Sequence, residues 1–211
     1  MNTEQVVALF TKGKVAESTK LVQESIDRGD DVELILNQVL IKAMEQIGDK
    51  FSEGTIFLPE MMVSARCMQA CLLILKPLLN SGAGSSGEIV VIGTVKGDLH
   101  DIGKNLVATM LEGGGFRVFD IGIDISVDKY VQAAQEHNAR IVCLSSLLTS
   151  TMPYMRQVIE GLRASPVGGN IKIMVGGAPV NEDYARKIGA DGFAPDAGMA
   201  VKKAKELLGL N

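Results

Sequence analysis

The spacing of apolar residues divides the chain into two parts with different periodicities. Before residue 80 the apolar positions recur at helical spacing, and no strand pattern is present. This pattern predicts four helices with short connections, which is typical of a small antiparallel bundle. Gly29 suits the position just beyond the second helix, Asp31 the N-cap of the third, and Pro59 the first turn of the fourth. The expected helices cover residues 3–12, 15–28, 31–51 and 59–79.

After residue 87 short apolar runs alternate with segments of helical periodicity. Strands are expected over residues 88–95, 117–122, 140–145, 171–176 and 192–195, and helices over residues 102–113, 127–138, 153–164, 181–189 and 197–208. Ser126, Asn181 and Asp196 suit the N-caps of three of these helices. Such alternation implies right-handed βαβ units, a parallel sheet and the flavodoxin-like strand order 2-1-3-4-5. The predicted fold is an all-α four-helix cap bundle followed by an α/β, Rossmann-like five-stranded parallel sheet.

A single low-complexity segment separates the two parts. Residues 81–87 are Ser-Gly-Ala-Gly-Ser-Ser-Gly, a composition that behaves as a flexible linker. We therefore expect a helical cap domain over residues 1–80, a Gly/Ser linker over residues 81–87 and an α/β domain over residues 88–211.

The composition is that of an ordinary globular protein, with 46% hydrophobic and 22% charged residues. A formal net charge of −4 without a dense block of Lys and Arg argues against nucleic-acid binding. The N-terminus lacks the basic and apolar regions of a signal peptide, and the longest near-apolar run, residues 72–79, is too short to span a bilayer. The three cysteines are expected to be reduced thiols. Together these features predict a soluble, cytoplasmic protein that does not contact a membrane.

The loop after the first predicted strand carries a candidate metal ligand. Its residues are Gly97, Asp98, Leu99, His100, Asp101, Ile102 and Gly103. In open α/β sheets ligands bind at the carboxyl edge of the strands, where this loop lies. A carboxylate two residues before a histidine can orient the imidazole and raise its basicity, as is usual for a metal-ligating histidine. Asp98 and His100 are therefore a candidate metal site.

Two further loops are expected to converge on this edge, because strands one, three and four are neighbours in the predicted order. The third loop carries a run rich in hydroxyl groups, residues 145–151. The fourth begins with Gly176 and Gly177, where the absence of a Cβ lets a ligand approach the backbone closely. A metal ligand, a set of hydroxyl groups and empty space together fit a large flat metal cofactor with a long tail.

These residues resemble a known motif. The loop around Asp98 and His100, followed by Ser145-x-Leu147 and Gly176-Gly177, is similar to the cobalamin-binding motif of B12-dependent methyltransferases and mutases. Residues 48–51 and 57–66 look like the cap bundle that precedes this domain in methionine synthase. A chain made of a cap and a corrinoid domain resembles the corrinoid protein of anaerobic, one-carbon methyltransferase systems.

The resemblance implies roles for individual residues. It implies that His100 replaces the dimethylbenzimidazole of the cofactor as the lower axial ligand of cobalt, with Asp98 and Thr151 as a hydrogen-bonded relay behind it. Methionine synthase has a serine where this chain has Thr151, which keeps the hydroxyl and adds a methyl group. The implied cofactor-binding residues are Gly97, Asp98, His100, Asp101, Ile102, Gly103, Ser145, Leu147, Thr149, Gly176 and Gly177.

The resemblance also implies partners. Histidine suits methyl transfer at cobalt because its ligation and its protonation compete near neutral pH. The implied function is a non-autonomous methyl carrier that works with a substrate-specific methyltransferase, a second methyltransferase with a folate or thiol acceptor, and a reductive activase. The methyl donor is recognised by the partner, so the sequence leaves methylamines, methanol, betaine and aryl methyl ethers open.

The cap residues are expected to keep the upper face of the corrinoid dry. Ten methionines and 4% aromatic residues fit a plastic apolar surface. We expect Phe57, with Met61 or Met62, to lie over the methyl position. Packing within the helical core is the alternative for each of these side chains.

Other interpretations remain open for the function and for two residue types. The chain can instead be the cobalamin-binding subunit of a mutase, which ordinarily does not need the cap, or a B12-based sensor, which adds a DNA-binding module. No G-x-G-x-x-G follows the first strand, which disfavours a dinucleotide site. Cys67, Cys71 and Cys143 are expected to be buried apolar residues rather than metal ligands, and His137 a surface residue at a helix C-terminus.

Overall fold

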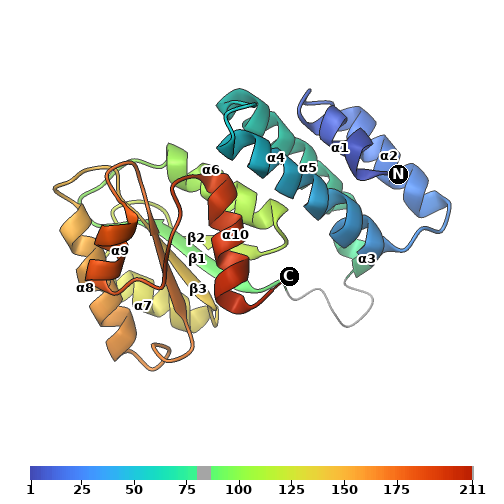
Figure 1. Cartoon of the computed structure of the whole chain (residues 1–211). Helices are drawn as coiled ribbons and strands as arrows, with labels where there is room; N and C mark the ends of the chain where they lie inside the picture. Colours follow the sequence, from blue (N-terminus) through green and yellow to red (C-terminus); the bar gives the residue numbers. More distant parts are fainter. Residues whose placement is uncertain (80–86, 211) are drawn as a thin grey trace. The chain divides into compact units, whose positions relative to one another are not determined.

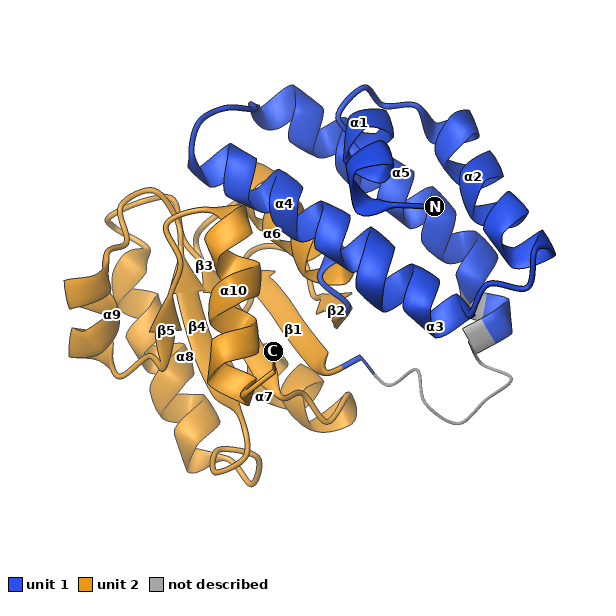
Figure 2. Ribbon diagram, turned by 45° about the vertical axis from the view of Figure 1, so that its right-hand side comes forward, with its two compact units in different colours: residues 1–87, 113–115 blue, residues 88–112, 116–211 orange. Residues whose placement is uncertain are grey.

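The computed structural model describes residues 1–79 and 87–210 (Figure 1). Residues 81–86 of the expected linker lie outside the described residues. The contacts divide the chain into two compact units, which Figure 2 colours separately. Unit 1 comprises residues 1–87 with 113–115, and unit 2 comprises residues 88–112 with 116–211.

Unit 1 is built from helices. Its elements are α1 (Thr3–Phe10), α2 (Val15–Asp27), α3 (Val32–Leu34), η1 (Ile35–Leu40), α4 (Ile41–Ser52) and α5 (Leu58–Leu79). The Asp31 carboxylate caps α3 by accepting the backbone N–H groups of Glu33 and Leu34 at 2.8 and 3.1 Å, and Gly29 follows α2 at a φ of 82°. The helix expected over residues 31–51 is continuous, but its middle part, η1, is π-helical. Apolar spacing predicts a helix without distinguishing the rare i→i+5 bonds of a π-helix from α-helical ones.

The helix α5 contacts each of the α-helices α1 to α4. Its buried side chains include Met61, Cys67, Met68 and Cys71. Over Leu58–Leu75 this helix has the length and the mean hydropathy, 1.4, of a membrane span. The search for uninterrupted apolar runs did not identify this stretch as a possible membrane span, because Glu60 and Arg66 interrupt it. The core helix of a soluble bundle meets the same two criteria, and the contacts of α5 fit that role.

Unit 2 contains a five-stranded sheet in which every pairing is parallel. The strands are β1 (Ile89–Thr94), β2 (Arg117–Asp120), β3 (Ile141–Ser145), β4 (Lys172–Gly176) and β5 (Gly192–Phe193). Their order, β2-β1-β3-β4-β5, confirms the predicted order. Thr94 pairs with Ser145, and Ser145 pairs with Gly176, so β1, β3 and β4 end level with one another. The loops that follow these strands therefore leave the sheet side by side.

Helices connect the strands and lie on both faces of the sheet (Figure 1). They are α6 (Ile102–Gly113), α7 (Val127–Glu136), α8 (Met152–Ala164), α9 (Glu182–Ile188) and α10 (Ala197–Leu208). The three predicted N-caps are confirmed, since Ser126, Asn181 and Asp196 each accept a backbone N–H three residues further on. Alternate apolar residues of β1, β3 and β4 pack against α7 and α8 in one buried cluster. The predicted fold class, a helical cap followed by a parallel α/β sheet, is confirmed.

Candidate functional site

The loop between β1 and α6 turns so that the Asp98 side chain is completely buried. The backbone N–H of Asp98 donates to the carbonyl of Val95 at 3.1 Å, which closes a tight turn. Gly97 sits in this turn at a φ of 84°, a conformation that favours glycine. Burying a carboxylate is costly unless hydrogen bonds satisfy both of its oxygens.

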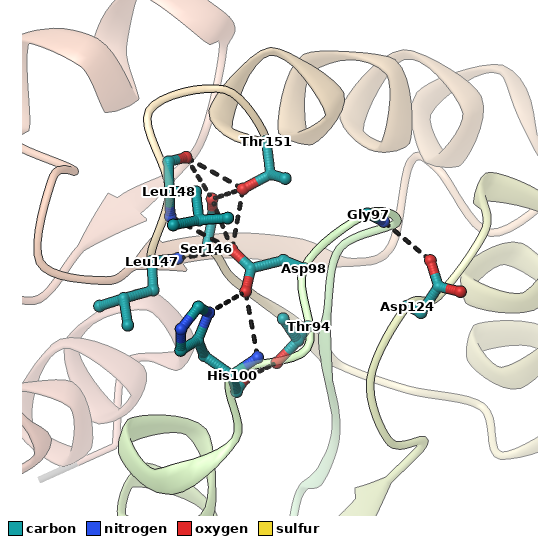
Figure 3. Close-up of polar contacts among 9 residues, drawn as sticks. All are labelled: Thr94, Gly97, Asp98, His100, Asp124, Ser146, Leu147, Leu148 and Thr151. Carbon is teal, nitrogen blue, oxygen red and sulfur yellow. Dashed lines mark hydrogen bonds and ion pairs between the residues drawn. The ribbon is translucent and has the colours of Figure 1, made fainter.

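One oxygen of Asp98 holds His100, as Figure 3 shows. Oδ1 lies 2.7 Å from His100 Nδ1, and the backbone N–H of His100 donates to the same oxygen at 3.1 Å. The His100 side chain is 51% exposed, whereas that of Asp98 is not exposed at all. An imidazole that donates from Nδ1 carries its lone pair on Nε2, so Nε2 is the nitrogen left to bind a metal.

The other oxygen of Asp98 is held by the loop that follows β3. Oδ2 accepts the backbone N–H groups of Leu147 and Leu148 at 2.8 and 3.3 Å. The hydroxyl of Thr151 donates to the same oxygen at 2.8 Å (Figure 3). A single buried carboxylate thus joins the loops after β1 and β3, and it has His100 on one side and Thr151 on the other.

Two opposing effects act on the pKa of Asp98. Burial raises the pKa of Asp98, whereas hydrogen bonds from His100, from the Leu147 N–H and from the Thr151 hydroxyl lower it. The hydrogen bonds prevail and hold this pKa well below its ordinary range. Asp98 is therefore ionised at neutral pH, and its Oδ1 is a charged acceptor for the Nδ1–H of His100.

Ser146 belongs to the same network, and the sequence analysis missed it. It is completely buried, its Oγ lies 2.8 Å from Thr151 Oγ1, and a longer contact of 3.5 Å reaches Asp98 Oδ2. The signal that pointed to it is strand alternation, which places Ser146 on the same side as the buried Leu144. A polar residue at an inward-facing position needs a partner, and the partner here is the Thr151 hydroxyl.

The donors and acceptors among the two hydroxyl groups follow from which acceptors are still available to them. The Thr151 hydroxyl has two acceptors within reach, Asp98 Oδ2 at 2.8 Å and the carbonyl of Leu148 at 2.9 Å. Ser146 Oγ lies 3.2 Å from the same carbonyl. That carbonyl already accepts the backbone N–H groups of Thr151 and Met152, both at 3.1 Å. The hydroxyl proton of Thr151 is therefore best placed on the ionised Asp98, which is the stronger acceptor. Ser146 can then donate to Thr151 Oγ1. The result is a chain of donors from Ser146 through Thr151 to Asp98.

The first turn of α6 is fixed by a second set of polar contacts. Thr94 Oγ1 donates to the carbonyl of His100 at 2.8 Å. The side-chain N–H of Asn105 donates to the Asp101 carboxylate at 3.1 Å, and the side-chain oxygen of Asn105 accepts a hydrogen bond from the Lys104 ammonium. Lys104 also pairs with Asp120. Asp101 thus organises the start of α6.

The expected glycines differ in what surrounds them. A Cβ at Gly177, which has a φ of 128°, would lie 1.8 Å from the carbonyl oxygen of Ser146, so close packing of the two loops already requires glycine there. A Cβ at Gly176 would make only an ordinary contact with Ala194, at 3.5 Å. A Cβ at Gly103 would meet no atom within 4 Å. The fold itself therefore gives no packing reason for glycine at Gly103.

Large apolar side chains are exposed on both sides of His100 in the sequence and in the loop that follows β3. They are Leu99, Ile102, Leu147 and Leu148, with exposed fractions of 67%, 73%, 42% and 41%. Ser145 ends β3 half-buried, and Thr149 is exposed in the loop beyond it. A cluster of exposed apolar residues of this kind marks a binding surface.

The cap residues lie in unit 1 and differ in burial. Met61 is completely buried, whereas Phe57 and Met62 are 65% and 59% exposed. Met61 therefore belongs to the core of this unit, and Phe57 and Met62 are the expected cap residues with accessible side chains.

The other singled-out residues lie outside the Asp98 network. Cys67, Cys71 and Cys143 are buried free thiols, as expected for apolar core residues. Burial raises the pKa of Cys71 and of Cys143 to about 12. His137 follows α7 and stacks on Phe119, with ring centroids 3.8 Å apart.

Two family models match the chain, and both describe a B12 binding domain. One covers residues 88–202, which include every residue of the Asp98 network, and the other covers residues 3–76. This chain belongs to the B12-binding family. It is a corrinoid protein of the kind found in methyltransferase systems, and its cofactor is cobalamin or a related corrinoid.

Relatives of this B12-binding protein align along most of its length. The dimethylamine corrinoid protein 2 of Methanosarcina acetivorans is 45% identical over 207 residues, which are 97% of this chain and 89% of that protein. A solved cobalamin-binding protein from Desulfitobacterium hafniense is 31% identical with a TM-score of 0.83, covering 98% of both chains. The methanol:cobalamin methyltransferase complex of Methanosarcina barkeri contains a chain that is 28% identical with a TM-score of 0.82, covering 97% of this chain and 78% of that one.

The residues at the sheet edge of this B12-binding protein fit a corrinoid. His100 offers a free Nε2 on a ring that Asp98 orients from behind, and imidazole nitrogen is a suitable ligand for a transition metal. The exposed apolar side chains beside it match the apolar surface of a macrocycle. The open space at Gly103 leaves room for a group that approaches α6.

Proposed function

We propose that this protein is a methyl carrier that binds its corrinoid base-off, with His100 Nε2 as the lower axial ligand of cobalt. The observation that carries the proposal is the hydrogen bond of 2.7 Å from the half-exposed His100 to the buried, ionised Asp98. Bound cobalt supplies a centre that accepts and releases a methyl group. The protein supplies the ligand, its orientation and the place where a proton is held.

Asp98 and Thr151 control the proton on His100. Asp98 would hold the Nδ1 proton of His100 and so would leave Nε2 as the atom that binds either the metal or a proton. The donors on Oδ2, above all Thr151, keep Asp98 ionised. The network would therefore link metal binding at Nε2 of His100 to the proton held on the imidazole.

The loops after β3 and β4 border the space for the nucleotide tail of the cofactor. Ser145 and Thr149 contribute hydroxyl groups to this space, and Gly103 and Gly176 leave it free of side chains. Gly177 contributes to the shape of this space indirectly, because it lets the loops after β3 and β4 pack closely. Gly97, Asp101, Ile102 and Leu147 complete the cofactor-binding set.

Phe57 and Met62 serve as the cover for the methyl position. Both are exposed on unit 1, and both present large apolar surfaces that exclude water and oxygen. Met61, which is completely buried, belongs to the core of this unit rather than to the cover.

The partners we propose are a substrate-specific methyltransferase, a second methyltransferase with a folate or thiol acceptor, and a reductive activase. Support comes from relatives named dimethylamine corrinoid proteins and from the solved methanol:cobalamin methyltransferase complex. Dimethylamine is therefore the first methyl donor to test, with methanol as the comparison.

The ligand assignment is tested by replacing His100 with alanine. We expect the cofactor-free His100→Ala variant to bind added cobalamin with a changed visible spectrum, because the lower ligand of cobalt is lost. His137→Ala is the matched control: it removes the other histidine, which stacks on Phe119, and should leave the spectrum unchanged. An unchanged spectrum in the His100 variant would remove His100 from the coordination sphere.

Isotope labelling separates a protein ligand from the cofactor's own base. Protein labelled with ¹⁵N-histidine and loaded with unlabelled cobalamin is reduced to its paramagnetic cobalt state. We expect the superhyperfine splitting in its EPR spectrum to change with the label, because the coordinating nitrogen is then a histidine nitrogen. A splitting that ignores the label would mean that the cofactor's base remains bound.

A further inference from the structure

The loop between β2 and α7 runs beside the loop that carries His100. The backbone N–H of Thr94 donates to the carbonyl of Gly122 at 3.0 Å, and the N–H of Ile125 donates to the carbonyl of Thr94 at 3.0 Å. Val95 and Ile125 form an additional parallel bridge. Pairing along β1 therefore continues past the end of β2, up to the turn at Gly97.

Asp124 makes two further contacts with that turn. Its backbone N–H donates to the carbonyl of Asp98 at 3.2 Å, and its Oδ1 accepts the backbone N–H of Gly97 at 2.8 Å (Figure 3). Asp124 thus holds the peptide group before Gly97 and the peptide group after Asp98, at the two ends of the Gly97–Asp98 segment. Among the residues that the structure describes, only the Asp98 side chain bonds the imidazole of His100, so the backbone position of Asp98 helps to set the position of the imidazole.

The backbone of Asp124 adopts an unfavourable conformation to make these contacts. Its φ is 55°, and among the described residues only Asn138 is another non-glycine with a positive φ. Asparagine and glycine tolerate this region better than most residues, and aspartate is tolerated because its short side chain bonds locally. A carboxylate there adds a charge-assisted acceptor for the Gly97 N–H.

We propose that Asp124 is a positioning residue that holds the Gly97–Asp98 turn in the form that presents His100 to cobalt. Gly97 has wide conformational freedom, and its φ of 84° is selected here by the bond to Asp124. Loss of that bond leaves the turn with more conformations and lowers the fraction of protein in which His100 reaches the metal. This inference rests on the proposed ligation by His100.

Three substitutions separate the acceptor from the backbone conformation. Asp124→Asn keeps an oxygen acceptor and a tolerated positive φ, Asp124→Gly keeps only the φ, and Asp124→Ala loses both. In cobalamin-loaded protein we expect Asp124→Asn to keep the His-ligated visible spectrum. Asp124→Gly and Asp124→Ala should lower the ratio of His-ligated to unligated cofactor by about two- to tenfold, the effect of one net hydrogen bond.

A second readout uses the cofactor-free protein. With only two histidines in the chain, the ring nitrogens of His100 are assigned in NMR spectra by comparison with a His137→Gln variant. We expect Asp124→Gly to move the His100 ring shifts toward those of Asp98→Ala, and Asp124→Asn to leave them unchanged. Asn138→Gly, a glycine at the other positive φ and outside the site, is the matched control and should move neither readout.

The outcomes distinguish this inference from the function on which it rests. If His100→Ala changes the spectrum while Asp124→Gly leaves both readouts as in the unmodified protein, the positioning role is wrong and the ligation stands. Equal losses in Asp124→Asn and Asp124→Gly also overturn it, because the acceptor is then not the cause. If His100→Ala leaves the spectrum unchanged, ligation fails, and the NMR shifts of the cofactor-free variants still decide the role of Asp124.

Discussion

The Asp98 carboxylate accepts hydrogen bonds from two loops. Some donors contact it directly, whereas others act through a neighbouring hydroxyl group. Thr151 donates straight to Oδ2 at 2.8 Å. Ser146 acts mainly through Thr151, because its contact with the Thr151 hydroxyl is 2.8 Å and its contact with the carboxylate is 3.5 Å. Bonds in such a chain polarise one another, so each hydroxyl strengthens the effect of the other.

A double-mutant cycle measures this coupling. We expect Thr151→Val to lower the free energy of unfolding of the cofactor-free protein by about 1–3 kcal/mol, because a buried carboxylate loses a donor. Ser146→Ala should cost about 0.5–1.5 kcal/mol, and the double variant less than the sum. Urea unfolding at pH 7 gives all three values. Strictly additive losses would mean that the two hydroxyls do not form a chain.

The cost of Thr151→Val should also depend on pH. The folded pKa of Asp98 is depressed below its unfolded value of about 4, so the stability it contributes is present above that pH and is lost as the pH falls toward the folded value. Thr151 helps to depress this pKa. The unfolded state titrates alike in both proteins, so the stability difference between the unmodified protein and Thr151→Val should be constant near neutral pH. It should shrink only as the pH falls through the folded pKa of Asp98 in the variant, which lies below the unfolded value. Urea unfolding at a series of pH values measures this difference.

At the scale of elements, the glycines of the three loops divide into those that the fold needs and those that it does not. Gly177 faces the carbonyl of Ser146 across two neighbouring loops. Gly103 lies in the first turn of α6 with open space in front of it. Alanine at these two positions should therefore affect stability in opposite ways.

We expect Gly177→Ala to destabilise the cofactor-free protein by about 3 kcal/mol or more, because the loops after β3 and β4 must separate. Gly103→Ala should leave it unchanged or stabilise it by up to about 1 kcal/mol, as alanine is favoured in a helix. The same Gly103 variant should bind cobalamin more weakly. Thermal unfolding and titration with cobalamin measure both effects. Full cofactor affinity in Gly103→Ala would place the nucleotide tail elsewhere.

The elements were predictable from the sequence where local pattern decides them. The bounds of α6 and α10 match the prediction, and the strand order follows from alternation alone. Asp98 and His100 meet because they are two residues apart on one turn. Asp124 was not predictable, since its contact with Gly97 spans 27 residues and depends on how β2 ends. Likewise, the π-helical form of η1 leaves no trace in apolar spacing.

At the scale of the whole molecule, the two units divide the work. The buried cluster that supports the sheet, with members from β1, β3, β4, α7 and α8, lies within unit 2, and so does every residue of the Asp98 network. Phe57 and Met62 belong to unit 1. The proposed lower ligand of cobalt and the proposed cover of its upper face should therefore be separable by cutting the chain.

We expect residues 88–211, expressed alone, to fold and to bind cobalamin with the same His100-dependent visible spectrum as the full chain. Without unit 1, oxygen should bleach the reduced corrinoid faster, because its upper face is open to solvent. Circular dichroism measures folding, visible spectra measure cobalamin binding, and stopped-flow mixing with oxygen measures the bleaching rate. The matched variant is the full chain with both Phe57→Ala and Met62→Ala. Bleaching in this double variant should fall between the full chain and the fragment, since the variant keeps the rest of unit 1. Equal rates in all three proteins would remove the covering role from unit 1 while leaving the His100 site intact.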